Sequence, residues 1–281
     1  MKAWRSRYVV AFDASGVAGA ALARGLGAPR VRALAYADLT PGALWPSPFE
    51  PNLRRPQEVT DGLREVARRL ALGASAVCLV LPDGVARMVD LDVPPDTSPV
   101  AFARYRLGPA LPFPAEEAVI DVLPLGRGRV LAAAVRRSVL EGYEVAAAEA
   151  GLAQERIDLA PLGALAALSQ GEPDGPAVGV VLGDAAVSLA SRTGGTVRVF
   201  RNRRRDPSGG ESRRLWAEAD RTAALAGEPS AARIRVVGAG ALALVRELQA
   251  AGAPAEAGWR VQGEGVAADG TELAWLGAAL A

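Results

Sequence analysis

One order of predicted strands and helices occurs twice along this chain, and this duplication limits the fold more than any single motif does. Each half opens with three short apolar strands separated by turn residues. The predicted strands are residues 7–13, 17–23 and 31–38 in the first half and residues 177–183, 186–191 and 196–201 in the second. Helices then alternate with strands in both halves. Two copies of this pattern predict an α/β fold built from two similar units.

The remaining elements follow from periodicity and from helix end signals. An amphipathic helix carries Val59, Leu63, Val66 and Leu70 on one face. In the first half we further predict a buried strand 76–81 with its neighbour 85–93, a helix 99–107 and a hairpin of 117–124 and 129–135. We then predict a helix with a capping box at Ser138 and Glu141 and a stop at Gly151. A strand 157–159 and a helix from Pro161 to near Gly171 complete this half. The second half predicts a helix 211–226, a strand 233–237, a helix 241–251, a short strand Trp259–Gln262 and a final helix Thr271–Leu280.

The best candidate for a linker is the stretch Gln170–Pro176, which is rich in Gly, Pro and acidic residues. We therefore expect a first lobe over residues 1–170 and a second lobe over residues 171–281. The final helix is available to pack back toward the first lobe.

Composition excludes several classes of protein. The chain has 281 residues, no histidine and one cysteine, Cys78, so Ser-His and Cys-His catalysis, histidine metal sites and a disulfide framework are excluded. Its formal net charge of +1 gives no general attraction to nucleic acid or anionic lipid. No apolar stretch approaches the ~20 residues that span a bilayer, and the N-terminus has no signal-peptide core. We expect a cytoplasmic protein.

The turn between the first two strands of each half contains part of an Asp-x-Gly pattern. The first turn contains Asp13, Ser15 and Gly16, and the second contains Gly183 and Asp184, with Val181 where Asp13 falls on superposition. In an Asp-x-Gly turn the carboxylate acts through a hydrated metal ion and the glycine lets the backbone approach phosphates. The first turn keeps the acid and the second keeps the glycine. This split predicts a nucleotide-binding architecture in which hydrolysis is weakened or lost.

Each candidate has a plainer structural alternative. Asp13 either holds water around Mg²⁺ or is a turn residue that bonds the backbone two positions on. Ser15 and Gly16 can present backbone N–H groups to an anion, and Gly183 and Ser188 can do likewise in the second half. Asp184 is displaced from the acid position and is expected to point elsewhere.

Two features of the second half have open interpretations. Gly238 and Gly240 lie between a predicted strand and a helix, where they either accept an adenosine or serve a tight turn that needs glycine. The basic run Arg201–Arg205 either contacts anionic lipid or an acidic partner, or is a solvated loop. No aromatic residues interleave with these arginines, so nucleic acid is not an expected partner.

Several of these segments, in this order and spacing, resemble the PilM family of type IV pilus assembly proteins and the related cytoplasmic region of GspL of type II secretion. The similar segments are Leu81-Pro82-Asp83, Arg87 to Pro94, Val130 to Arg137, the helix running to Tyr143, Ala150-Gly151-Leu152, Ile157-Asp158, Val181 to Ser188, Gly194-Gly195 and Phe200-Arg201. The resemblance covers nearly the whole chain and is strongest in the middle.

The resemblance implies an actin-like ATPase fold of two ribonuclease-H-like lobes, with an inserted subdomain in the first lobe over about 80–137 and a shortened second lobe. It also implies a scaffold at the inner face of the bacterial inner membrane. Its partner would be the N-terminal cytoplasmic tail of a single-span PilN-like protein, held in a groove of the first lobe. An extended peptide added to an exposed sheet edge is the expected docking mode.

The chain departs from the family at both phosphate turns and at the adenine-side turn. We therefore expect no catalytic residues and no metal site. ATP and Mg²⁺ are expected to bind weakly if they bind, through Asp13, Ser15, Gly16, Gly183, Ser188, Gly238 and Gly240. Two alternatives stay open, a GspL-like adaptor that recruits a motor ATPase and an active ATPase of the actin superfamily.

Overall fold

The computed structural model describes residues 7–23, 30–73, 75–168, 177–193, 196–205, 211–228 and 233–258. The predicted linker Gln170–Pro176, the strand Trp259–Gln262 and the helix Thr271–Leu280 lie outside these residues.

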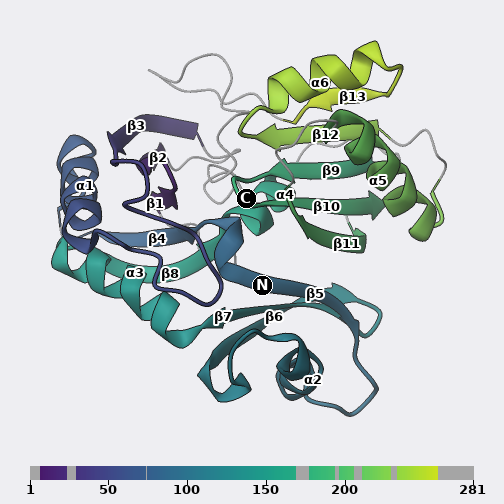
Figure 1. Ribbon diagram of the computed structural model, residues 1–281, viewed down its shortest axis with the longest axis horizontal. Coiled ribbons are helices and arrows are strands. Elements are labelled where there is room, and N and C mark those ends of the chain that lie inside the picture. The colour runs from purple at the N-terminus through teal and green to yellow at the C-terminus, as the bar shows by residue number, and fades with distance from the viewer. Residues whose placement is uncertain are drawn as a thin grey trace.

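Two five-stranded sheets with the same topology form the centre of the molecule (Figure 1). The first has the order β3-β2-β1-β4-β8, and the second has the order β11-β10-β9-β12-β13. The strands of the first sheet are β1 Tyr8–Asp13, β2 Gly16–Ala23, β3 Arg30–Asp38, β4 Ala76–Leu81 and β8 Ala153–Leu159. The strands of the second sheet are β9 Ala177–Leu182, β10 Ala186–Thr193, β11 Thr196–Arg204, β12 Arg233–Gly238 and β13 Ala255–Ala257. In each sheet, three antiparallel strands are followed by two parallel ones. The predicted duplication is confirmed, and we call the two units the first lobe and the second lobe.

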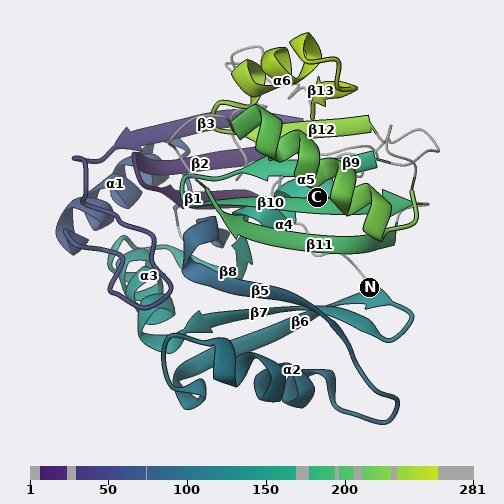
Figure 2. The ribbon, with the colours of Figure 1, turned by 45° about the vertical axis from the view of Figure 1, so that its right-hand side comes forward.

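A third sheet is inserted between β4 and β8 of the first lobe, and it forms the lower part of the molecule in Figure 2. It is antiparallel, with the order β5-β7-β6, and α2 packs on one of its faces. These elements are β5 Ala86–Asp92, β6 Ala118–Gly126, β7 Arg129–Arg136 and α2 Pro99–Leu107. In the second lobe only α6 (Ala241–Ala250) lies between the equivalent strands β12 and β13. The second lobe is therefore the shorter one.

Helices cover the sheets where strand residues alternate between the two faces. On β9, Val178, Val180 and Leu182 belong to the core beneath α5 (Glu211–Leu225) and α6. The neighbouring residue Val181 faces the other way, into the core that contains α4 (Ala160–Leu168). This period of two buries both faces of the strand. The same large core joins the two lobes through α4.

In the first lobe, α1 (Pro56–Arg69) and α3 (Arg137–Glu149) lie side by side against the sheet (Figure 1). Val59, Leu63 and Val66 are fully buried, as the predicted apolar face of α1 requires. Tyr143 of α3 is also fully buried, and its ring meets Phe12 of β1 edge-on at 4.7 Å between centroids. This packing fixes α3 above the end of β1, where the first turn begins.

Three local predictions differ from the structure. The capping box at Ser138 is wrong because α3 begins at Arg137 directly after β7, so Arg136 occupies the N-cap position and no side chain caps the helix. The strand at Ile157 is longer than expected and begins at Ala153, since β8 is an edge strand whose first four residues are exposed and lack apolar alternation. β13 was not predicted, because three residues carry no periodic signal.

Candidate functional site

The first-lobe turn joins β1 to β2 and contains Asp13, Ala14 and Ser15. Asp13 Oδ1 accepts hydrogen bonds from the Ser15 backbone N at 2.7 Å and from Ser15 Oγ at 2.5 Å. The Tyr36 hydroxyl lies 2.8 Å from Ser15 Oγ and donates to it, since the serine hydrogen is already directed at Asp13. One oxygen of Asp13 thus forms an Asx-type turn with the backbone.

Gly16, the first residue of β2, is required by packing within the sheet. A Cβ on Gly16 would overlap the Tyr36 ring and hydroxyl and would lie 2.6 Å from the Ala37 carbonyl oxygen. Burial raises the pKa of Tyr36. The neutral phenol is therefore retained as a hydrogen-bond donor to the turn.

The second-lobe turn joins β9 to β10 and receives an acid from the first lobe. Asp83 lies at the start of a single 3₁₀ turn, Asp83–Val85, directly after β4, and only 6% of its surface is exposed. Its Oδ2 accepts a hydrogen bond from the backbone N of Ala186 at 2.9 Å. A Cβ on Gly183 would overlap the same carboxyl group. The carboxylate of Asp83 therefore lies directly against the glycine of the second turn.

Burial raises the pKa of Asp83 to about 6, against an ordinary value of 3.8. The backbone hydrogen bond from Ala186 opposes this rise, and the nearby charge of Asp184 adds to it. Among the described residues, Asp83 forms no ion pair with an arginine. In this part of the chain, the groups that stabilise its charge are backbone N–H groups.

Asp184 reaches from the second lobe toward the first turn. Its Oδ2 lies 3.5 Å from the backbone N of Ala14, which donates to it. Burial, and next the charge of Asp13, raise the pKa of Asp184. Asp184 therefore points toward the first-lobe turn, a contact that the sequence did not predict. Sequence comparison of the two turns missed the contact because Ala14 and Asp184 are 170 positions apart.

Ser188 lies on β10, where its side chain is buried and accepts a hydrogen bond from Asn202 Nδ2 of β11 at 2.9 Å. It pairs with Val181 across the sheet. Its hydroxyl is thus used within the second sheet, whereas Gly183 is at the turn itself.

Gly238 and Gly240 form the passage from β12 into α6, and both have left-handed backbone angles, φ +105° and φ +81°. A Cβ on Gly238 would also overlap the carbonyl oxygen of Leu182. Backbone geometry alone therefore requires glycine at both positions.

Two of the four arginines in the basic run, Arg203 and Arg205, bind other groups of the second lobe. Arg205 donates to the carbonyl oxygens of Gly183 at 2.8 Å and Ala239 at 3.3 Å, and so joins the second-lobe turn to the start of α6. Arg203 pairs with Glu211 at 2.9 Å and with Glu218 at 2.5 Å on α5. These two arginines serve the second lobe. In the described parts of the chain, no three acidic or cysteine side chains converge to hold a metal ion.

A second candidate site is a groove of about 300 Å³ in the first lobe. One wall is the segment Pro51–Leu53 with the start of α1, and the other is the face of α3 that carries Gly142, Val145 and Ala146. A Cβ built on Gly142 would meet nothing within 4 Å. The groove is mainly apolar, and Glu141 and Glu149 stand along it.

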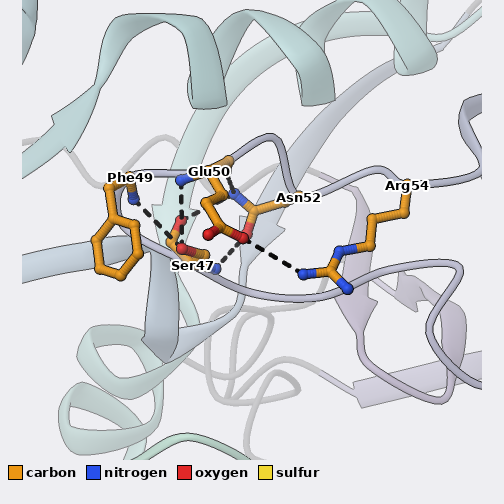
Figure 3. Close-up of polar contacts among 5 residues, drawn as sticks. All are labelled: Ser47, Phe49, Glu50, Asn52 and Arg54. Atoms are coloured by element: carbon orange, nitrogen blue, oxygen red, sulfur yellow. Dashed lines mark hydrogen bonds and ion pairs between the residues drawn. The ribbon is translucent and has the colours of Figure 1, made fainter.

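The loop that forms this wall is held by a buried polar pair, Ser47 and Asn52 (Figure 3). Asn52 Nδ2 donates to the carbonyl oxygens of Ser47 at 2.9 Å and Glu50 at 3.2 Å, and Asn52 Oδ1 accepts from Ser47 N. Arg136 of β7 donates to the Phe49 carbonyl oxygen at 2.6 Å and pairs with Glu117 at 2.8 Å. The groove wall is therefore ordered before any ligand arrives.

The duplicated sheets, the inserted sheet and the paired turns together define the actin-like ATPase fold. A chain of the PilM-PilN type IV pilus biogenesis complex superimposes with a TM-score of 0.78 over 98% of each chain at 20% identity. The cytoplasmic domain of EpsL, an inner membrane component of the type II secretion system of Vibrio cholerae, has a TM-score of 0.52 at 12% identity, over 92% of this chain and 90% of that one. A Bacteroides thetaiotaomicron protein with an actin-like ATPase fold and unknown function has a TM-score of 0.52 at 10% identity, over 88% of each chain.

At these identities the similarity establishes the fold. No protein-family model matches the sequence, and no curated protein matches it significantly. No helix in the described parts of the chain is long and apolar enough to cross a bilayer.

The contact between Gly183 and Asp83 predicts that substitutions at these two positions have strongly coupled effects on stability. Gly183→Ala should lower the free energy of unfolding by about 1–3 kcal/mol, because the new methyl group overlaps the carboxyl of Asp83. The same substitution in an Asp83→Ala background should cost at least about 1 kcal/mol less. Urea unfolding of the wild type, the two single variants and the double variant measures this double-mutant cycle. Gly142→Ala, where the added methyl meets open space, is the matched control, and additive effects at 183 and 83 would contradict the contact.

The raised pKa of Asp83 predicts a pH dependence of stability. Because its folded-state pKa of about 6 exceeds its ordinary value of 3.8, the folded protein binds more protons between these two pH values. The free energy of unfolding should therefore fall by on the order of 3 kcal/mol as the pH rises through this window and stay level above it. Asp184 shifts in the same direction, so the measurement is the difference between urea unfolding curves of the wild type and Asp83→Asn. Parallel pH profiles for the two proteins would disprove the assignment.

Proposed function

We propose that this protein is a PilM-like scaffold without efficient ATPase activity, which binds the cytoplasmic tail of a PilN-like membrane protein. The observation that carries the proposal is the state of the two phosphate turns. The N–H groups of Ser15, Ala14 and Ala186 already donate to Asp13, Asp184 and Asp83. A triphosphate needs such donors, and three carboxylates beside it would repel its charge.

The residues present do not fit a nucleotide bound as in a working actin-like ATPase. The second turn has Val181 where a metal-bound acid would stand, and Ser188 is committed to Asn202. ATP and Mg²⁺ therefore have no role in the proposed function. This favours a scaffold over the alternative of an active ATPase.

The proposed binding site for the tail is the groove between the loop wall and α3. Its apolar walls and its ordered backbone suit a short apolar segment, because little side-chain or loop entropy is lost on binding. Segments on the cytoplasmic side of membrane spans are enriched in Lys and Arg, and Glu141 and Glu149 along the groove complement that charge. This mode uses a helix-lined groove, in place of the sheet edge expected from the sequence.

Such a tail would hold the protein peripherally at the inner face of the membrane, with a motor ATPase as a further possible partner. The likeness to the PilM-PilN complex chain covers both chains almost completely, which favours the pilus role. A secretion adaptor like EpsL is the second candidate, supported by the lower TM-score of 0.52.

Filling the groove should abolish partner binding without harming the fold. Gly142→Leu places a side chain into open space and replaces glycine within α3, which should stabilise the helix by up to about 1 kcal/mol. We expect this variant to weaken binding at least about tenfold. The assay is fluorescence anisotropy with a labelled peptide, the cytoplasmic tail of a single-span membrane protein encoded beside this chain.

Ala148→Leu is the matched control, because Ala148 lies exposed on the same helix and does not line the groove. It should bind the peptide like the wild type. Equal binding by both leucine variants would exclude the groove, and no binding by the wild type would remove this tail as the partner.

Nucleotide should neither stabilise the protein nor be hydrolysed by it. In a thermal-shift titration, millimolar Mg-ATP should leave the melting temperature of the wild type unchanged, since the turn N–H groups are occupied. A phosphate-release assay on the same samples should stay at background. A saturable shift accompanied by phosphate release would establish the ATPase in place of the scaffold.

A further inference from the structure

The two turns are held by acids of the opposite lobe. Asp83 belongs to the first lobe and bonds Ala186 of the second-lobe turn, while Asp184 belongs to the second lobe and bonds Ala14 of the first-lobe turn. The backbone N–H groups of Ala185 and Gly84 also act to lower the pKa of the Asp83 carboxyl, and so favour its charged form. The arrangement is reciprocal, although the two acids occupy unrelated places in their lobes.

We propose that Asp83 is an internal anion that occupies the second-lobe turn in the place of a phosphate, and that it holds the two lobes closed without any nucleotide. This inference goes beyond the scaffold function, because it explains how the lobes stay together whatever partner binds in the groove.

The first argument is the fit between carboxylate and turn. A turn that presents successive N–H groups binds an oxyanion, and a bare glycine lets that anion approach the backbone. The φ angle of Gly183 lies outside the left-handed region, so its backbone conformation does not itself require glycine. The three nearest atoms that a Cβ on Gly183 would meet all belong to the carboxyl group of Asp83. Glycine at this position therefore serves the approach of Asp83.

As a second argument, Asp83 has no cationic partner among the residues that the structure describes. An ordinary acid at an interface is paired with Arg or Lys, but among the described residues Asp83 has only backbone donors and an acidic neighbour, Asp184. Arg205 contacts the same turn, where its guanidinium donates to the carbonyl oxygens of Gly183 and Ala239. The turn thus binds the carboxylate of Asp83 through a backbone N–H group, as it would bind a free anion.

The third argument is the tight packing around the acid. A Cβ on Gly84 would lie 3.0 Å from Cβ of Ala185 and 3.1 Å from Cβ of Pro46. The segment carrying Asp83 is therefore enclosed between the second-lobe turn and the loop of the first lobe. Opening the lobes requires Asp83 to leave the turn.

The experiment is chemical rescue by a small free anion. Asp83→Ala removes the carboxylate, leaving turn donors and a space that formate can fill. Its melting temperature should fall, and sodium formate should restore at least half of the loss, while sodium chloride at equal ionic strength should not. The wild type and Asp121→Ala, which removes an exposed acid of β6, should respond alike to both salts.

Hydrogen exchange locates the effect at the turn. Exchange of the Ala186 amide should rise at least about tenfold in Asp83→Ala and fall again with formate, while the amides of Val180 and Val236 in the second sheet stay protected. Equal effects of formate and chloride, or an unchanged Ala186 amide, would overturn the proposal. If Asp83→Ala does not fold in either salt, hydrogen exchange of the Ala186 amide is measured in Asp83→Asn instead. Its carboxamide is neutral, so the Ala186 amide should exchange faster than in the wild type, and wild-type protection in Asp83→Asn would also overturn the proposal. These results are independent of peptide binding in the groove.

Discussion

The carboxylate-to-backbone contacts across the two lobes are the interactions on which the arrangement of this molecule depends. Asp83 meets Gly183 and Ala186, and Asp184 meets Ala14, so each turn is bonded by the opposite lobe. A buried carboxylate costs several kcal/mol in desolvation unless hydrogen bonds offset it. That requirement explains why the raised pKa of Asp83 coexists with N–H donors directed at its oxygens.

These contacts also connect the fold to the proposed role. Backbone N–H groups at such turns are donors that a phosphate could use. Here the same donors are used within the chain, and the core around α4 joins the lobes through apolar packing as well. The protein then presents an ordered surface, in which Ser47, Asn52 and Arg136 hold the groove wall. A rigid platform suits a partner that must bind without a nucleotide cycle.

Much of the fold was predictable from local pattern. The buried face of α1 follows from Val59, Leu63 and Val66, and the strands of the two meanders follow from their apolar runs and turn residues. The prediction was wrong where the local sequence signal was weak. The edge strand β8 has few apolar residues, and Ser138 has the residue type of a cap but lies one residue inside a helix that starts straight from β7.

The sequence by itself determined the duplicated lobes and the divided Asp-x-Gly pattern, because strand alternation, helix periodicity and turn residues are local properties of the chain. It could not show which groups the two turns contact in the folded protein. Asp83 is 103 positions from Ala186, and nothing near it in the chain marks it as a ligand of the second turn. Only the tertiary structure brings that carboxylate to Gly183, because the contact depends on how two separately formed sheets pack against each other.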